Sequence, residues 1–114
     1  MRTITESTIE TIIKDKGATI NSKGEMVTFK TGYQVSKRDL IKIPVRDLTA
    51  SIIINNLRCL SSSNEYLGLW IEDGLAYVDI SCRVATKRDA MTMGKCLNQI
   101  SILRWSDMKC LSVR

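Results

Sequence analysis

Residues 66–82 read YLGLWIEDGLAYVDISC, two runs of strand-forming residues joined by Asp73-Gly74. Asp-Gly is the preferred pair for a two-residue type I′ turn, and a turn of that length fixes the register of the strands on either side. On one side of the paired strands every facing pair is then apolar: Leu67 with Ile80, Leu69 with Val78, and Ile71 with Ala76. Because side chains alternate between the two faces of a strand, the sequence predicts an antiparallel hairpin with one wholly apolar face in the core.

The other face of this hairpin carries residues of mixed chemistry. Its facing pairs are Tyr66 with Ser81, Gly68 with Asp79, and Trp70 with Tyr77. Asp79 therefore stands beside two aromatic rings and opposite a residue that has no side chain. Two interpretations of this carboxylate stay open: an ion-pair partner for a nearby Lys or Arg, or an acceptor for a hydroxyl or base of a ligand.

The segments on either side of the hairpin complete an α+β domain. Helices are predicted over residues 6–16, 47–60 and 87–97, and further strands over residues 18–21, 25–36, 40–43, 99–105 and 108–113. Gly17 is expected to end the first helix, Asp47 to cap the second, and Thr86 with Asp89 to cap the third. The expected fold class is α+β, a mostly antiparallel sheet of about six or seven strands with about three helices, in one ligand-binding domain over residues 1–114.

Three single residues carry further expectations about local geometry. Gly32 is expected to mark a bend or bulge in the strand predicted around it. Leu97 is expected to face the sheet from the last turn of the third helix. Asn98 is expected to end that helix, because asparagine tolerates the left-handed backbone geometry found at helix ends.

The length and composition are those of one globular domain. The chain has 114 residues, of which 44% are hydrophobic and 25% are charged, so we expect it to fold and not to be disordered. No stretch approaches the roughly 18 consecutive apolar residues that span a bilayer. Residues 1–6 are polar and lack the apolar core of a signal peptide. The sequence therefore predicts a cytoplasmic protein that does not enter a membrane.

Several kinds of catalytic and cofactor site are excluded by residue type. The chain has no histidine, which removes nucleophilic catalysis through a histidine base. Its four cysteines are scattered without a C-x-x-C pair, so no zinc site is expected. Neither of the phosphate-binding glycine motifs, G-x-x-x-x-G-K-[ST] and G-x-G-x-x-G, occurs. The sequence favours a binding protein over an enzyme, with no cofactor and no metal.

The positive charge of the chain is concentrated near its end. The net charge is +5, and residues 83–114 contain seven Lys and Arg against two Asp, whereas residues 1–82 are balanced. Such a distribution favours an anionic partner. Lys87 and Arg88 fall in the first turn of the predicted helix 87–97, where free N–H groups and the helix dipole attract a phosphate. The aromatic side chains available to stack on a base are Trp70, Tyr77 and Trp105. We expect the cations of residues 83–114 and the ring-bearing face of the hairpin to meet in one pocket that holds a phosphorylated small molecule.

Five short segments together resemble a family of phage proteins. They are KDKGAT at 14–19, TGYQVS at 31–36, LGLWIEDG at 67–74, YVDIS at 77–81 and NQISI at 98–102. The family is that of the first-described Thoeris anti-defence proteins, phage-encoded sponges for immune signalling nucleotides. The resemblance implies that the chain sequesters cyclic ADP-ribose isomers made by bacterial TIR-domain proteins without degrading them. Some family members are also hexamers that hold cyclic trinucleotides, the CBASS-type signals, at separate sites between subunits.

The resemblance also implies which residues contact the ligand. Asn98 resembles the family's ligand-contacting asparagine, and Arg88 lies near a position that lines the same pocket, where the family has a bulky aromatic residue. Gly17 and Gln34 lie near the trinucleotide-binding region, and the family's C-terminal arginines correspond loosely to basic residues within 104–114. The expected ligand-binding residues are Gly17, Tyr33, Gln34, Lys87, Arg88, Asn98, Arg104 and Trp105.

The leading hypothesis is a phage anti-defence protein that binds and sequesters cyclic nucleotide signals in the cytoplasm of the host bacterium. It is expected to act as a homo-oligomer, dimer or hexamer, with no membrane contact. One alternative is a small protein-binding inhibitor of a host defence complex, of the anti-CRISPR type. The other is a small nuclease or phosphodiesterase that uses Asp79 and a metal. Sequence-specific DNA binding is not expected, because a hairpin and not a short turn separates the two longer predicted helices.

Overall fold

The computed structural model describes residues 4–114, so expectations about residues 1–3 lie outside it. Over this range the chain forms six strands, three α-helices and one short 3-10 helix. In chain order they are α1 (Glu6–Asp15), β1 (Gly17–Ile20), β2 (Tyr33–Pro44), η1 (Val45–Asp47), α2 (Ala50–Leu57), β3 (Glu65–Glu72), β4 (Leu75–Val84), α3 (Lys87–Cys96), β5 (Ser101–Arg104) and β6 (Lys109–Ser112). The strands make one antiparallel sheet in the order β1-β3-β4-β2-β5-β6. The expected α+β class is confirmed.

The hairpin of β3 and β4 has the register that Asp73-Gly74 predicts. Both turn residues have a positive φ, 53° and 76°, as a type I′ turn requires. The six facing pairs expected over residues 66–81 all occur. The apolar face is buried, with exposed fractions of at most 5% for Leu67, Leu69, Ala76, Val78 and Ile80. The turn pair alone was therefore enough to place this face in the core.

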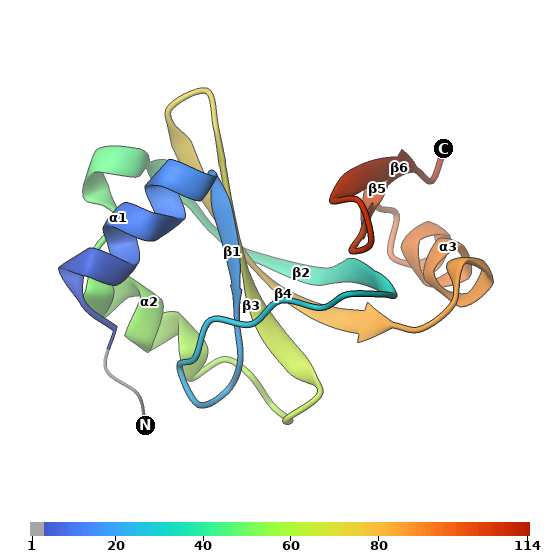
Figure 1. Ribbon diagram of the computed structural model, residues 1–114, viewed down its shortest axis with the longest axis horizontal. Helices are drawn as coiled ribbons and strands as arrows, with labels where there is room; N and C mark the ends of the chain where they lie inside the picture. Colours follow the sequence, from blue (N-terminus) through green and yellow to red (C-terminus); the bar gives the residue numbers. More distant parts are fainter. Residues whose placement is uncertain (1–3) are drawn as a thin grey trace.

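The core lies on one side of the sheet, in two parts. Near one end, α1 and α2 pack on the apolar face of the hairpin through Ile9, Ile12, Ile53 and Leu57. At the other end, α3 and the β5–β6 hairpin enclose a smaller cluster, which consists of Val35, Ala90, Ile102 and Val113. Figure 1 shows these two parts at opposite ends of the long strands β2 and β4. None of the helices in residues 4–114 has the length and apolar character needed to cross a membrane.

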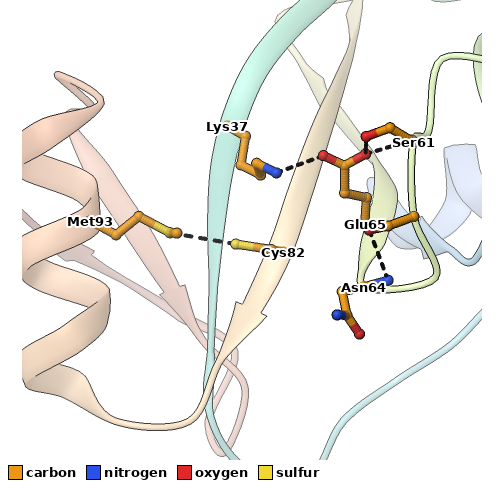
Figure 2. Close-up of polar contacts among 7 residues, drawn as sticks. Lys37, Ser61, Asn64, Glu65, Cys82 and Met93 are labelled. Atoms are coloured by element: carbon orange, nitrogen blue, oxygen red, sulfur yellow. Dashed lines mark hydrogen bonds and ion pairs between the residues drawn. The ribbon is translucent and has the colours of Figure 1, made fainter.

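A buried carboxylate marks the boundary between the two parts of the core (Figure 2). A bulge in β2 next to Ser36 turns Lys37 toward β3, where its Nζ lies 2.6 Å from Glu65 Oε2. The N–H and the hydroxyl of Ser61 donate to Glu65 Oε1 at 2.7 and 2.8 Å. Lys37 and Ser61 together lower the pKa of Glu65 from 4.5 to about 2. The charge on this buried group is therefore stable at neutral pH because each oxygen has a donor.

The strand predicted over residues 25–36 is wrong in its first part. Residues 25–32 are irregular and contact β1 through a single bridge between Ile20 and Met26, whereas β2 runs without a break from Tyr33 to Pro44 and includes the predicted strand 40–43. Phe29 packs its ring against Tyr66 on the face opposite the core, so this segment crosses the sheet and does not extend it (Figure 1). The predicted bend at Gly32 is confirmed, with a φ of 89°.

Three expectations about helix ends are also corrected. Thr49, not Asp47, caps α2 by accepting from the Ile52 N–H at 3.3 Å, and the helix ends at Leu57. Lys16, with a φ of 62°, takes the left-handed position after α1, so Gly17 is free to begin β1. Leu97 was expected to face the sheet, but it follows the last residue of α3 and is 37% exposed. The Thr86 cap of α3 and the left-handed Asn98, with a φ of 58°, are confirmed.

Candidate functional site

The face of the sheet that points away from α1 and α2 is polar, and we call it the concave face. Cross-strand register places its residues in three rows across β1, β3, β4 and β2. The rows are Gly17, Trp70, Tyr77 and Lys42; then Thr19, Gly68, Asp79 and Asp39; then Tyr66, Ser81 and Ser36. Successive side chains of a strand point to opposite faces of the sheet, so these residues lie on the face opposite the core.

A side-chain hydrogen bond between β1 and β2 shows how strongly the sheet is curled. Two strands, β3 and β4, separate β1 from β2, which would place β1 and β2 about 14 Å apart in a flat sheet. Thr19 Oγ1 nevertheless donates to Gln34 Oε1 at 3.0 Å, and Gln34 Nε2 donates to Ser81 Oγ at 2.7 Å. The sheet therefore curls into a half-barrel around the concave face.

Asp79 lies at the centre of the concave face and lacks a partner for its Oδ1 oxygen. Its carboxyl rests on Gly68, where an added Cβ would overlap Oδ1. That oxygen is buried and accepts no hydrogen bond from residues 4–114, and the three ion pairs of this range do not include Asp79. The interpretation of Asp79 as the partner of a Lys or Arg is therefore not borne out in the described part of the chain.

The surroundings of Asp79 favour its neutral form. Burial, and next the negative charge of Asp39 on the adjacent strand, raise the pKa of Asp79 from 3.8 to about 7. A protonated carboxyl can donate one hydrogen bond and accept others. In the next row Ser36 Oγ is also buried, and it lies close enough to the Asp79 carboxyl to lower its pKa in part, although no hydrogen bond of good geometry joins the two in the described residues. Buried polar groups in proteins are nearly always hydrogen-bonded, so the concave face carries two neighbouring polar groups whose hydrogen bonding is incomplete.

A cavity of about 420 Å³ opens beside Asp79. It is lined by residues 39–42 of β2 and 77–79 of β4, and a bulge in β2 between Asp39 and Ile41 shapes its wall. At this end of the face the Lys42 ammonium lies 5.5 Å from the centre of the Tyr77 ring. Trp70, the cross-strand neighbour of Tyr77, is 45% exposed. The cavity thus combines a half-buried carboxyl, a cation and the ring of Tyr77, and the exposed ring of Trp70 lies beside it.

The opposite end of the concave face is closed by the segment between β1 and β2, residues 25–32, which we call the strap. Its Phe29 ring lies edge-on between two rings, 5.5 Å from Tyr66 and 5.3 Å from Trp105. Arg83 holds the strap by donating from Nε to the Thr31 carbonyl and from Nη2 to the Thr31 hydroxyl, both at 3.1 Å. The strap therefore covers this end of the concave face, and the cavity lies toward the other end.

Three of the ligand-binding residues expected from the sequence lie on or beside the concave face. Gly17 faces Trp70 across β1 and β3, and a Cβ there would be 2.8 Å from the Leu69 carbonyl oxygen. Gln34 bridges Thr19 and Ser81, as described above. Trp105 lies under the strap with only 5% of its surface exposed, so its ring is closed to a ligand in this conformation.

The other expected residues belong to the α3 and β5–β6 region. Lys87 and Arg88 begin α3, and both side chains are exposed. Arg88 Nε lies 3.5 Å from Asp89 Oδ1. Tyr33 pairs with Arg104, whose guanidinium binds Asp107. Asn98 receives two hydrogen bonds from Arg114.

These cations do not converge with the exposed aromatic rings within one chain. Tyr77 lies near the hairpin end of β4, and Arg83 lies near the other end, before α3. At about 3.4 Å per residue, the two are roughly 20 Å apart along the strand. Arg104 and Arg114 also bind groups of the same chain. The pocket expected from the sequence, in which these cations meet the rings of Trp70 and Tyr77, is therefore absent from the described part of the chain.

Several residues of the site were not found from the sequence. They are Thr19, Ser36, Asp39 and Lys42. The alternation of the hairpin places Ser81 on this face, but the residues of β2 could not be assigned to a face because two bulges shift its register. Residues 4–114 contain no group of three or more His, Cys, Asp or Glu side chains placed to hold a metal ion.

Comparison with models of protein families, with curated proteins and with solved structures finds no match for the chain. The chemistry of the concave face is therefore the basis for a functional assignment, together with the resemblance of the short sequence segments.

Proposed function

We propose that this chain is a phage anti-defence protein that binds a cyclic nucleotide signal, a cyclic ADP-ribose isomer or a cyclic trinucleotide, and holds it without degrading it. The resemblance of the five sequence segments supplies the class of ligand. The observation that carries the binding role is the cavity lined by Asp79, Lys42 and Tyr77, with the exposed ring of Trp70 beside it.

The chemistry of this cavity suits one orientation of such a ligand. A nucleobase stacks on an aromatic face and offers N–H donors and ring-nitrogen acceptors at its edge. A carboxyl such as Asp79, which changes protonation near neutral pH, can pair with either kind of group. A phosphate would be repelled by Asp39 and Asp79 but attracted by Lys42. The base therefore belongs inside the cavity, and the phosphates belong at its mouth.

Thermal unfolding in the presence of candidate ligands tests the proposal. A protein that binds a ligand only in its folded state melts at a higher temperature as the ligand concentration rises. We expect such a rise with at least one cyclic ADP-ribose isomer or cyclic trinucleotide, and recovery of the intact ligand after heating. A hydrolysed product in the released fraction would contradict storage without degradation and favour the phosphodiesterase alternative.

Two sets of variants distinguish the concave face from the residues implied by the resemblance. Trp70→Ala removes the exposed ring beside the cavity and Asp79→Asn removes the titratable carboxyl that lines it, whereas Asn98→Ala and Arg88→Glu alter the α3 region. Met108→Ala, which truncates a side chain that is 60% exposed, is the matched control. Loss of the ligand-induced shift in the first set alone assigns the concave face. Loss in the second set alone would remove the cavity from the binding site.

Assembly into a homo-oligomer is part of the proposal. β1 and β6 are the outer strands of the sheet; the outer edge of β1 is partly covered by its bridge to Met26, whereas β6 leaves one edge without a strand partner in the described residues. Such edges are the ordinary place for pairing with another chain. An assembly would also bring the α3 region of one copy near the concave face of another, which one chain alone does not do. Native mass measurement with and without ligand reports the copy number and the bound mass together.

A protein-binding inhibitor is the second candidate, and the exposure of Trp70 favours it. Tryptophan is enriched among the residues that dominate binding energy at protein interfaces, and here it lies 45% exposed on a rigid hairpin. If no cyclic nucleotide raises the melting temperature, this candidate replaces the first.

A further inference from the structure

The outer edge of β6 presents backbone groups that have no strand partner. The Val113 N–H donates to the Ile100 carbonyl at 2.9 Å, and the register pairs Leu111 with Ile102. In an antiparallel pair the backbone groups of successive residues point alternately toward the partner strand and away from it. The N–H and C=O groups of Cys110 and Ser112 therefore point away from β5, to the side where β6 has no neighbouring strand within residues 4–114.

One flank of α3 faces this edge. The helix packs on the β5–β6 hairpin at Gly94, where an added Cβ would lie 3.0 Å from the side chain that follows β6. On one flank of the helix, the Met93 sulfur lies 3.5 Å from the Cys82 sulfur of β4. Lys87 and Lys95 lie on the opposite flank, because each is roughly 200° around the helix from Met93. Since the strands follow the order β4-β2-β5-β6, the flank with the two lysines faces the β6 side of the sheet (Figure 1).

The side chains around this edge are cationic, with an apolar side chain at one end. Lys109 lies on the same side of β6 as Leu111, which packs against the cluster under α3. Lys87, Lys95 and Lys109 are exposed, and none of the ion pairs in residues 4–114 includes them. Ile100, at the end of the β5–β6 hairpin, is 68% exposed. The edge thus combines unpaired backbone groups, unpaired cations and an accessible apolar residue.

We propose that the outer edge of β6 is a docking site for an extended acidic segment of a partner protein, which joins the sheet as a seventh strand. The backbone of the segment pairs with Cys110 and Ser112, and its carboxylates lie beside Lys95 and Lys109. A second copy of the chain would bring the same cations to the edge, and facing like charges destabilise strand pairing. We therefore assign this edge to a partner and not to the contact between copies.

The proposed site is independent of the concave face. It lies on β6, whereas the cavity beside Asp79 lies between β2 and β4. The inference therefore holds whichever ligand the cavity binds. A nucleic acid would also neutralise the lysines, but it has no backbone amides with which to extend the sheet.

A labelled peptide of alternating glutamate and valine is the probe, and fluorescence anisotropy is the measurement. We expect saturable binding to the wild type and none by the same peptide with lysine in place of glutamate. A peptide with proline in place of valine keeps the charge but cannot pair as a strand, so it is expected to bind about tenfold more weakly. Equal binding by the proline peptide would overturn the proposal. Tighter binding by a single-stranded DNA of the same charge would also overturn it.

Cys110→Pro tests the backbone of the edge. It removes an N–H that points away from β5, and proline is tolerated at such positions of edge strands. We expect peptide binding to weaken about tenfold, and Cys110→Ser, which keeps the N–H, to bind as the wild type does. Wild-type affinity in a folded Cys110→Pro would refute the site. A lower copy number for this variant in native mass measurement would show that β6 pairs with a second copy, and would refute it as well.

The cations are tested without any change to the backbone, which covers the case in which the proline variant does not fold. The double variant Lys95→Glu, Lys109→Glu is expected to lose most of the peptide binding. Its matched control is Lys23→Glu, Lys30→Glu, which changes the net charge equally at two exposed positions between β1 and β2. Equal losses in the two double variants would mean that net charge alone attracts the peptide, and the assignment to β6 would fail.

Discussion

Thr19 and Gln34 are joined by a side-chain hydrogen bond of 3.0 Å although β3 and β4 separate their own strands in the sheet. Gln34 also donates to Ser81 on β4, at 2.7 Å. The curl of the half-barrel is thus accompanied by a chain of three polar side chains on the concave face. Thr19 and Ser81 are 6% and 1% exposed, so neither hydroxyl has water as an alternative partner.

Removing Gln34 is expected to cost more stability than removing Thr19. In Gln34→Ala both buried hydroxyls lose their partner, and an unsatisfied buried polar group costs about 1–3 kcal/mol. In Thr19→Val the Gln34 to Ser81 bond remains. Denaturant unfolding measures both losses, with Ser112→Ala as a control at an exposed hydroxyl. Equal losses in the two variants would show that the chain of hydrogen bonds does not act as described.

Gly68→Ala is expected to displace the Asp79 carboxyl, because the new Cβ would overlap its Oδ1. The cost to the free energy of unfolding is expected to be about 1–3 kcal/mol, as for other overpacked buried positions. In an Asp79→Ala background the same substitution is expected to cost less than about 1 kcal/mol, since the two residues are coupled by direct contact.

Gly17→Ala is the matched control for this pair. Its Cβ would meet the Leu69 carbonyl oxygen at 2.8 Å, a backbone atom that Asp79→Ala does not remove. Its cost is therefore expected to be the same in both backgrounds. If the cost of Gly68→Ala is also unchanged, the carboxyl does not rest on Gly68 in solution.

The parts of the fold that were predictable are those set by local chemistry. The Asp73-Gly74 turn correctly predicted six cross-strand pairs, and Thr86 correctly predicted the start of α3. Both were predictable because a turn or a helix cap depends on only a few neighbouring residues. The strap was predicted as a strand because its alternating β-formers fit that pattern equally well. Its true course depends on Phe29 packing against Tyr66 and Trp105, which lie 37 and 76 residues further along the chain.

The candidate site was predictable only in part, for a related reason. The hairpin register places Asp79 opposite Gly68 from sequence alone. Which residues of β2 face Asp79 depends on two bulges, and each bulge shifts the register by one residue. The clustering of cations in residues 83–114 predicted a pocket with the aromatic rings. In the structure Tyr77 and Arg83 lie near opposite ends of β4, so these cations do not reach the rings of Trp70 and Tyr77. The pattern of charges in the sequence carries no information on the distance along this strand.

Glu65→Gln is expected to destabilise the protein at neutral pH. The substitution removes the charge-assisted bond from Lys37, and hydrogen bonds to charged groups contribute about 1.5–3 kcal/mol. The lowered pKa of Glu65 gives stability that is fully present above pH 4.5 and is lost as the pH falls toward 2. Denaturant unfolding at pH 7 and pH 3 is therefore expected to show a steeper acid loss in the wild type than in the variant.

Asp107→Asn provides the comparison for Glu65. Arg104 Nη2 lies 2.6 Å from Asp107 Oδ2, the same distance as in the Lys37–Glu65 pair. Both side chains of the Arg104–Asp107 pair are about one-third exposed. Water screens such a pair, so its removal is expected to cost clearly less than that of Glu65. A larger loss for Asp107→Asn would mean that burial does not govern the strength of these two ion pairs.

Asp79 has the opposite linkage between pH and stability. Its pKa is about 7 in the folded protein and near 3.8 when the chain unfolds. Between these values the folded state holds a proton that the unfolded state has released, so the free energy of unfolding falls as the pH rises. Above pH 7 the penalty is complete, because the folded protein then carries a half-buried carboxylate whose Oδ1 has no donor within residues 4–114.

Asp79→Asn is therefore expected to raise the free energy of unfolding at pH 8, by on the order of 2 kcal/mol, with little change at pH 4. Asp39→Asn is the matched control, since it removes a neighbouring negative charge and is expected only to move the pH window of Asp79 downward. Denaturant unfolding of the three proteins between pH 4 and 8 measures both effects. A variant less stable than the wild type at pH 8 would mean that Asp79 has a structural partner, and the cavity would then lose the unpaired group on which the proposed binding site depends.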